Sequence, residues 1–303
     1  MVYDKYSFKV PQEKQVRVIM DTDAKNEADD QYAIVHALLS PKFDNVGIIA
    51  AHFGKEKSPN SMRDSYEEIV KVLDLMEFDH SLAFQGGVEA LPDKSTPVVS
   101  EGAKLIIDEA MKDDPRPLFV TFLGPLTDLA SAVLLEPRIQ GRLTAIWIGG
   151  GRYPAGGWEY NLSNDINAAN VVMKSSLDLW QIPQNVYQYV LVSFAELEAR
   201  VKPYGEIGQY LYNQLIEHAM TPHGMGGGLR TGEAWILGDS PAVGVILGEH
   251  DFRFRMIQAP EITADMYYVH TGKNRLIKVY DYVDSRFILE DFYAKLKNFA
   301  AKQ

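Results

Sequence analysis

Apolar segments rich in β-branched residues alternate with segments of helical periodicity along most of this 303-residue chain. Six short apolar runs are expected to form strands, at residues 16–20, 46–51, 81–84, 118–122, 145–148 and 185–190. The segments between them have helical spacing, at residues 29–39, 61–75, 101–111, 126–134 and 167–175. This alternation predicts an α/β fold with an open, mostly parallel sheet flanked by helices.

The alternation becomes less regular after about residue 192. Helices are expected at residues 194–201 and 207–218, followed by a Gly-rich stretch, an apolar segment at 235–247 and a final helix at 287–299. No internal repeat is visible, and no linker rich in Pro, Ser or charge divides the chain. We therefore expect one domain, residues 1–303, with irregular C-terminal additions.

Bulk composition narrows the classes of partner. The net charge of −11 argues against a nucleic-acid backbone as ligand, because nucleic-acid-binding proteins usually present clustered Lys and Arg. No apolar run reaches the roughly 20 residues needed to cross a bilayer, and the N-terminus has no apolar core of a signal peptide. A cytoplasmic protein is the expectation, although a signal could have been removed. The absence of cysteine leaves oxygen and imidazole chemistry for any site.

Clustered acids are the sharpest chemical signal. A buried strand runs directly into Asp21 and Asp23, and Asp29 and Asp30 follow where the next helix begins. A helix N-terminus stabilises a carboxylate by only ~0.3–1 kcal/mol, which is too little for four acids brought into one cleft. A cation is the natural compensation, and all-oxygen ligation indicates Ca²⁺ or Mg²⁺, with Ca²⁺ favoured by loose geometry. The alternative is a helix cap at Asp29 beside solvated neighbours.

An Asp-x-Asp strand end also resembles the haloacid dehalogenase-like phosphatases, whose acidic Gly-Asp motif is similar to Gly238-Asp239 here. That class has Thr or Val where this chain has Lys25, and a further acid where this chain has Val243. The phosphatase interpretation is therefore the weaker one.

Four separated segments together resemble the nucleoside hydrolases. They are the Asp cluster, Gly124-Pro125-Leu126-Thr127-Asp128, Gly149-Gly150 with Trp158-Glu159-Tyr160-Asn161, and Gly238-Asp239-Ser240-Pro241. The resemblance covers nearly the whole chain and implies a Rossmann-like fold, a calcium ion and a homo-oligomer, either a dimer or a tetramer.

The resemblance also implies roles, which are carried over residue by residue. Asp23 would be the general base and a metal ligand, and the other ligands would be Asp30, Asp239 and the carbonyl of Leu123. Asp29, Glu159 and Asn161 would bind ribose hydroxyls, with Asp21 in support.

Departures from the family pattern fall around the base-binding end. Five residues separate Asp23 from Asp29 instead of the usual three, and Lys55 stands where the family has a ribose-binding Asn. Gly238 replaces a His that helps the leaving base depart in the family. These changes suggest a divergent branch with a retained ribose end and a rebuilt base pocket.

Three further residues are candidates for the site, and each also has a purely structural interpretation. His52 ends a strand and is either an active-site residue or a packed histidine. His223 opens the Gly-rich stretch, which is either a mobile flap carrying the leaving-group acid or an irregular connection. Trp158 either stacks on the departing group or belongs to the core.

The predicted activity is calcium-dependent hydrolysis of the N-glycosidic bond of a ribonucleoside or related N-riboside. The missing His and Asn keep a second hypothesis open, a non-catalytic calcium-dependent binder of sugar or nucleoside on the same fold.

Overall fold

The computed structural model describes residues 6–221, 232–248 and 252–301. Its main sheet has eight strands in the order β3-β2-β1-β4-β5-β6-β12-β9, and all neighbours are parallel except β12 and β9. The strands are β1 (Val16–Thr22), β2 (Phe43–Ala50), β3 (Ala83–Gln85), β4 (Leu118–Phe122), β5 (Thr144–Ile148), β6 (Asp178–Ile182), β9 (Phe254–Gln258) and β12 (Leu276–Tyr280). The predicted α/β class with a mostly parallel sheet is confirmed.

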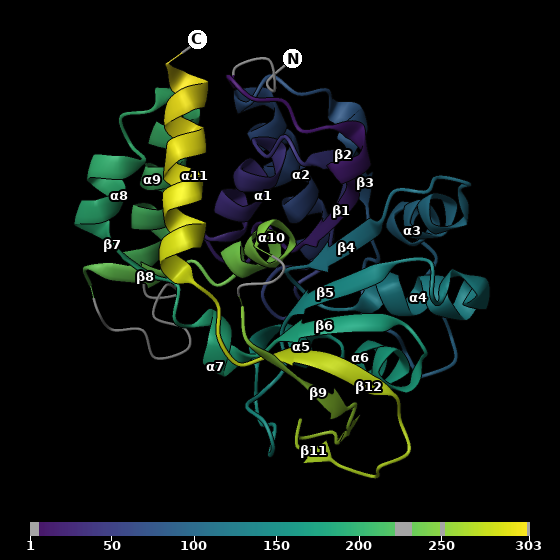
Figure 1. Ribbon diagram of the computed structural model, residues 1–303. Helices are drawn as coiled ribbons and strands as arrows, with labels where there is room; N and C mark the ends of the chain where they lie inside the picture. Colours follow the sequence, from purple (N-terminus) through teal and green to yellow (C-terminus); the bar gives the residue numbers. More distant parts are fainter. Residues whose placement is uncertain (1–5, 222–231, 249–251, 302–303) are drawn as a thin grey trace.

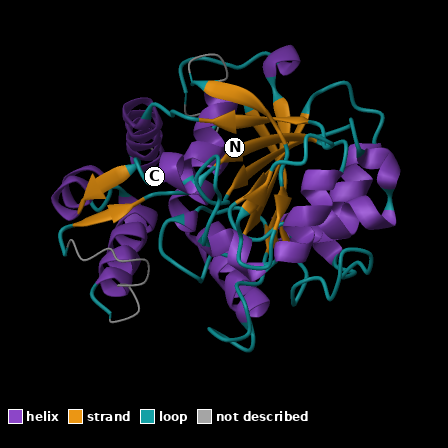
Figure 2. Cartoon of the chain, turned by 90° about the horizontal axis from the view of Figure 1, so that it is seen from below, coloured by secondary structure: helices purple, strands orange, loops and turns teal. Residues whose placement is uncertain are grey.

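Helices cover both faces of this sheet (Figures 1 and 2). Alternate residues of each strand face opposite layers, so in β1 Val18 and Met20 join one core and Ile19 joins the other. The first core is closed by α1 (Asp30–Leu38), α2 (Ser61–Leu75), α8 (Phe194–Arg200), α9 (Gly205–Ala219), α10 (Ser240–Leu247) and α11 (Ser285–Ala300). The second is closed by α3 (Glu101–Met111), α4 (Thr127–Leu135) and α6 (Ile166–Lys174).

Shorter elements complete the chain at the edges of the two layers. They are η2 (Gln12–Lys14), η3 (His80–Leu82), η4 (Pro137–Ile139), α5 (Tyr160–Asn164), α7 (Gln184–Tyr187), β7 (Leu191–Ser193) paired with β8 (Ala234–Ile236), and β10 (Glu261–Ile262) paired with β11 (Tyr268–Val269). No helix in the described ranges is long and apolar enough to cross a membrane.

One predicted strand is wrong. Residues 185–190 were expected to be extended, but Gln184–Tyr187 form α7, and the strand of this region is β6, residues Asp178–Ile182. The two apolar runs lie on either side of Pro183, which caps α7. A short apolar run does not distinguish strand from helix by periodicity, and the sheet selects the run that pairs with both β5 and β12.

The strand order places a topological switch point between β1 and β4. From β1 the chain moves outward to β2 and β3, and from β4 it continues outward in the other direction. Loops at the carboxyl ends of β1 and β4 therefore diverge onto opposite faces and leave a crevice between them, where ligands of open α/β sheets bind.

Candidate active site

A cleft lies at this switch point, in the place where ligands of open α/β sheets bind. Its walls come from the loop after β1, the ends of β4 and β5, and the starts of α1, α5 and α10. The lining residues are Asp23, Asn26, Glu27, Asp29, Asp30, Leu123, Ile148, Glu159, Tyr160, Asn161, Tyr187, Gly238 and Asp239. Sequence segments more than two hundred residues apart thus meet in one place.

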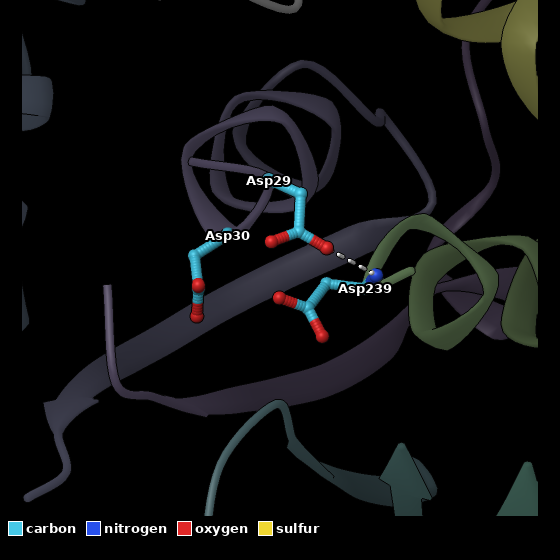
Figure 3. A group of neighbouring side chains, drawn as sticks. All are labelled: Asp29, Asp30 and Asp239. Carbon is cyan, nitrogen blue, oxygen red and sulfur yellow. Dashed lines mark hydrogen bonds between the residues drawn. The ribbon is translucent and has the colours of Figure 1, made fainter. Parts of the chain in front are cut away.

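Three buried carboxylates converge in this cleft (Figure 3). Oxygens of Asp29, Asp30 and Asp239 lie within 4.8 Å of one another. Asp29 and Asp239 occupy the positions that cap the N-termini of α1 and α10, and the Asp239 backbone N–H donates to Asp29 Oδ2 at 3.2 Å. Both helices therefore direct their positive dipole ends toward the acids.

The raised pKa values of these three carboxyl groups indicate that the surrounding protein does not compensate their negative charges. Burial, and then Asp30, raises the pKa of Asp29 to about 8. Burial and neighbouring carboxylates raise the pKa of Asp30 and of Asp239 well above the usual range. Crowded, buried oxygen ligands of this kind fit a hard divalent cation, since a bound cation offsets the repulsion that otherwise forces the carboxylates to hold protons.

Asp23 borders the same cleft from the end of the β1 segment. Its carboxylate accepts a hydrogen bond from Asn26 Nδ2 at 3.0 Å, and burial raises its pKa. A Cβ atom on Gly124 would stand only 3.0 Å from Asp23 Cγ, so the glycine lets the loop after β4 approach this acid closely.

Asp21 lies behind this layer. It is fully buried, and neither carboxylate oxygen has a hydrogen-bond partner in the described part of the chain. Burial, and then Asp128 and Asp23, raises its pKa well above the usual range. Asp21 is therefore not among the residues that line the cleft, and its supporting role stays a prediction.

Asn161 orients a carbonyl at the base of the cleft. Its Nδ2 donates to Leu123 O and to Ile148 O, both at 2.8 Å. Both amide hydrogens are thereby used, so Oδ1 is the atom that Asn161 can offer to a ligand. The Leu123 carbonyl keeps a second lone pair for a further partner.

Glu159 is held by four donors of the protein itself. Its carboxylate accepts from the backbone N–H groups of Gly150, Asn161 and Leu162 at 2.7, 3.2 and 2.9 Å. The hydroxyl of Tyr187, which also lines the cleft, donates to Oε1 at 2.8 Å. Glu159 thus caps α5 and fixes Tyr187, and little of its acceptor capacity remains for a ligand.

Two residues that were predicted to bind substrate do not line the cleft. His52 is buried, and its Nε2 lies 2.9 Å from the Thr127 hydroxyl, which itself donates to Asp165 at 2.7 Å. Burial lowers the pKa of His52 to about 4, so it is a neutral, packed histidine. Trp158 is 53% exposed and meets Tyr160 edge-on with ring centroids 6.0 Å apart. His223, the remaining candidate, lies outside the described residues.

Four polar residues of the cleft were not predicted from the sequence, namely Asn26, Glu27, Tyr160 and Tyr187. Glu27 and Asn26 belong to the longer loop between Asp23 and Asp29, so the unusual spacing was the available signal. Burial, and then Asp29, raises the pKa of Glu27 to about 8. Tyr187 carried no signal, because it lies in the segment that was interpreted as a strand.

Known proteins resemble this chain in both sequence and fold. Residues 18–288 match the family model described as inosine-uridine preferring nucleoside hydrolase. The chain is 27% identical over 220 residues to the probable uridine nucleosidase 2 of Arabidopsis thaliana, covering 64% of this chain and 67% of that protein. It is 23% identical over 231 residues to the pyrimidine-specific ribonucleoside hydrolase RihA of Salmonella arizonae, covering 68% and 72%.

A solved structure of a purine-preferring ribonucleoside hydrolase from Gardnerella vaginalis superposes with a TM-score of 0.76 at 18% identity, covering 95% of this chain and all of that one. This likeness bears on the fold. Because the family model spans most of the sequence, including every segment of the cleft, the chain belongs to the inosine-uridine preferring nucleoside hydrolase family and is a hydrolase of N-glycosidic bonds.

Proposed function

We propose that this protein hydrolyses the N-glycosidic bond of a ribonucleoside or a related N-riboside, with calcium in the cleft. The observation that carries the proposal is the convergence of Asp29, Asp30 and Asp239 within 4.8 Å beside Asp23 in the same cleft. We assign the ion to Asp23, Asp30, Asp239 and the Leu123 carbonyl, an all-oxygen set of the kind that calcium prefers.

The reaction passes through an oxocarbenium-like transition state, so it needs an activated water on the sugar face opposite the base and a firm grip on the ribose hydroxyls. Bound calcium would supply a polarised water. Asp23 accepts the proton of the attacking water, and its hydrogen bond from Asn26 keeps the carboxylate oriented. Asp29 accepts from a ribose hydroxyl.

Sugar binding is completed from the α5 side of the cleft. Asn161 offers Oδ1, since its Nδ2 is committed to two carbonyls. Glu159 acts on the sugar through the oriented Tyr187 hydroxyl more than by direct contact, because its own oxygens already accept four hydrogen bonds. These contacts fix the ribose for attack. His223 remains a candidate acid for the leaving base.

A non-catalytic calcium-dependent binder is the second candidate, and the absence of a side chain at Gly238 favours it. Reducing-sugar release from a panel of ribonucleosides separates the two, run with calcium and with chelator. Calcium-dependent release supports the hydrolase. Nucleoside binding without release overturns it in favour of the binder, and a chelator-treated protein that takes up no calcium overturns both.

We also propose a homo-oligomer, on the family resemblance alone. A monomer by light scattering at micromolar concentration would contradict this.

A further inference from the structure

Lys57 brings a positive charge to the rim of the acidic cleft. It lies on the connection between β2 and α2, and its Nζ stands 3.2 Å from the centre of the Tyr160 ring. The same Nζ lies 3.3 Å from Asn26 Oδ1. Both partners line the cleft, so this ammonium is placed at the mouth of the site by contacts with the site's own walls.

The contacts of the rim form a continuous chain to the general base. Tyr160 donates from its hydroxyl to Asn26 Oδ1 at 2.7 Å, and Asn26 Nδ2 donates to Asp23 Oδ2 at 3.0 Å. The side-chain amide of Asn26 thus orients both Tyr160, whose ring lies under Lys57, and the carboxylate of Asp23. The attraction between the ammonium and the face of the aromatic ring favours this position for a side chain that remains exposed to solvent.

Among the residues that the structure describes, the lining of the cleft offers no other donor for a departing base. Breaking the bond between the anomeric carbon and the base nitrogen leaves the electron pair on the base, and a donor or a positive charge must stabilise it. Position 238 has no side chain, and the Tyr187 hydroxyl donates to Glu159. The charged residues that line the described cleft are all acids, which oppose the developing negative charge, whereas Lys57 lies against two of its wall residues.

We propose that Lys57 contacts the leaving base and stabilises it with a hydrogen bond from Nζ. The substrates are then N-ribosides whose leaving group departs as an anion with an acceptor atom, such as a nucleobase with a carbonyl or ring nitrogen. This inference rests on the proposed function. Water supplies the hydroxyl of the sugar product, Asp23 takes the remaining proton, and the released base is protonated from solvent, so the step balances.

Lys55 offers a matched control two residues away on the same loop. Although Lys55 stands at the position of the family's ribose-binding Asn, its ammonium pairs with Glu89, both side chains are largely exposed, and neither residue lines the cleft. Replacing it changes the net charge equally and leaves the contacts of Lys57 in place. Lys57→Met keeps the length of the side chain without its charge, and Lys57→Arg keeps the charge with a different donor geometry.

The experiment compares wild type, Lys57→Met, Lys57→Arg and Lys55→Met on uridine, inosine and 4-nitrophenyl riboside, with calcium present. Nitrophenolate departs readily without stabilisation. For Lys57→Met we expect kcat on the two nucleosides to fall roughly 10- to 100-fold, and on the nitrophenyl substrate less than about threefold, since removal of leaving-group assistance affects poor leaving groups most. Lys57→Arg should retain part of the activity, and Lys55→Met should match wild type.

An equal fall on all three substrates, or no fall on any, overturns the role of Lys57 while leaving the hydrolase intact. A wild-type protein that releases sugar from none of the three overturns the proposed function itself. A series of substituted phenyl ribosides gives an independent readout, because loss of leaving-group stabilisation must steepen the dependence of rate on leaving-group pKa. An unchanged slope in Lys57→Met would also overturn the inference.

Discussion

The ring of Tyr187 occupies the space beside Gly238, with Cδ2 only 3.0 Å from where a Cβ atom at position 238 would stand. The same ring carries the hydroxyl that donates to Glu159. A Cβ atom at position 238 would crowd this ring, so the lack of a side chain at Gly238 allows Tyr187 to occupy the cleft. The position that holds a His in the resembling family is filled from another element, α7.

Substituting Gly238→Ala should displace Tyr187 and weaken its hydrogen bond to Glu159. We expect the free energy of unfolding to fall by ~1–3 kcal/mol, from overpacking and a disturbed buried hydrogen bond. Denaturant titration measures this. Gly248→Ala is the control, because its added Cβ would meet only ordinary contacts at 3.4 Å. The double variant with Tyr187→Ala should lose less than the sum of the single losses, and strict additivity would contradict the steric link.

The periodicity of the chain was sufficient for β1, β2, β4 and β5 at the centre of the sheet. Strands β1, β2 and β4 have apolar side chains on both faces, so their patterns are strong and local. Strands β9 and β12 were missed because each is only five residues long and is interrupted by a charged residue, Arg255 in β9 and Lys278 in β12, and because the apolar side chains of β9 are mostly exposed. Their pairing depends on a return of the chain from the far C-terminal region, and no local pattern encodes that.

The acidic half of the site was predictable for a related reason. Asp21, Asp23, Asp29 and Asp30 fall within ten residues at a strand end, so one segment carries both the chemistry and the geometry. Tyr187 lies in α7, and its place in the cleft depends on the absence of a side chain at Gly238, fifty-one residues later. Such a relationship between distant segments becomes visible only in three dimensions.

Replacing Asp23 by Asn should abolish most turnover while preserving the fold. The amide is nearly isosteric but cannot accept the proton of the attacking water, and we expect kcat to fall by roughly 10²–10⁴ or more. Initial rates of sugar release measure the loss, and calcium titration shows how much of it comes from weakened metal binding. Full activity at saturating calcium would rule Asp23 out as the base.

Asn161→Ala should chiefly weaken ribose binding, whereas Glu159→Ala should chiefly lower the stability of the fold. Asn161 offers a free Oδ1, so its loss should remove about 1–3 kcal/mol of binding to a ribose hydroxyl and penalise 2′-deoxynucleosides less than ribonucleosides. Glu159 accepts four internal hydrogen bonds, so its loss should chiefly lower stability. Comparing kcat/KM ratios with unfolding free energies separates the two effects. An unchanged ribose-to-deoxyribose ratio in Asn161→Ala would contradict direct sugar contact.

Stability of the metal-free protein should decrease as pH rises through neutrality. Burial raises the pKa of Asp29 from 3.8 to about 8 in the folded protein, so between these values the folded state holds a proton that the unfolded state has lost. The associated stability is fully present below the unfolded pKa and is lost as pH rises through the folded pKa. Each retained proton corresponds to a slope of roughly 1 kcal/mol per pH unit.

Urea titrations in the presence of chelator, at several values between pH ~5 and ~8, measure this slope. Asp29→Asn should make it shallower, since the amide does not titrate. Calcium should reverse the trend, because its binding requires the ionised carboxylates and therefore strengthens as protons leave. If the stability of the chelator-treated protein instead rises steadily over this range, the acids of the cleft are already ionised without a cation. The argument for a metal from the crowding of these acids would then fail.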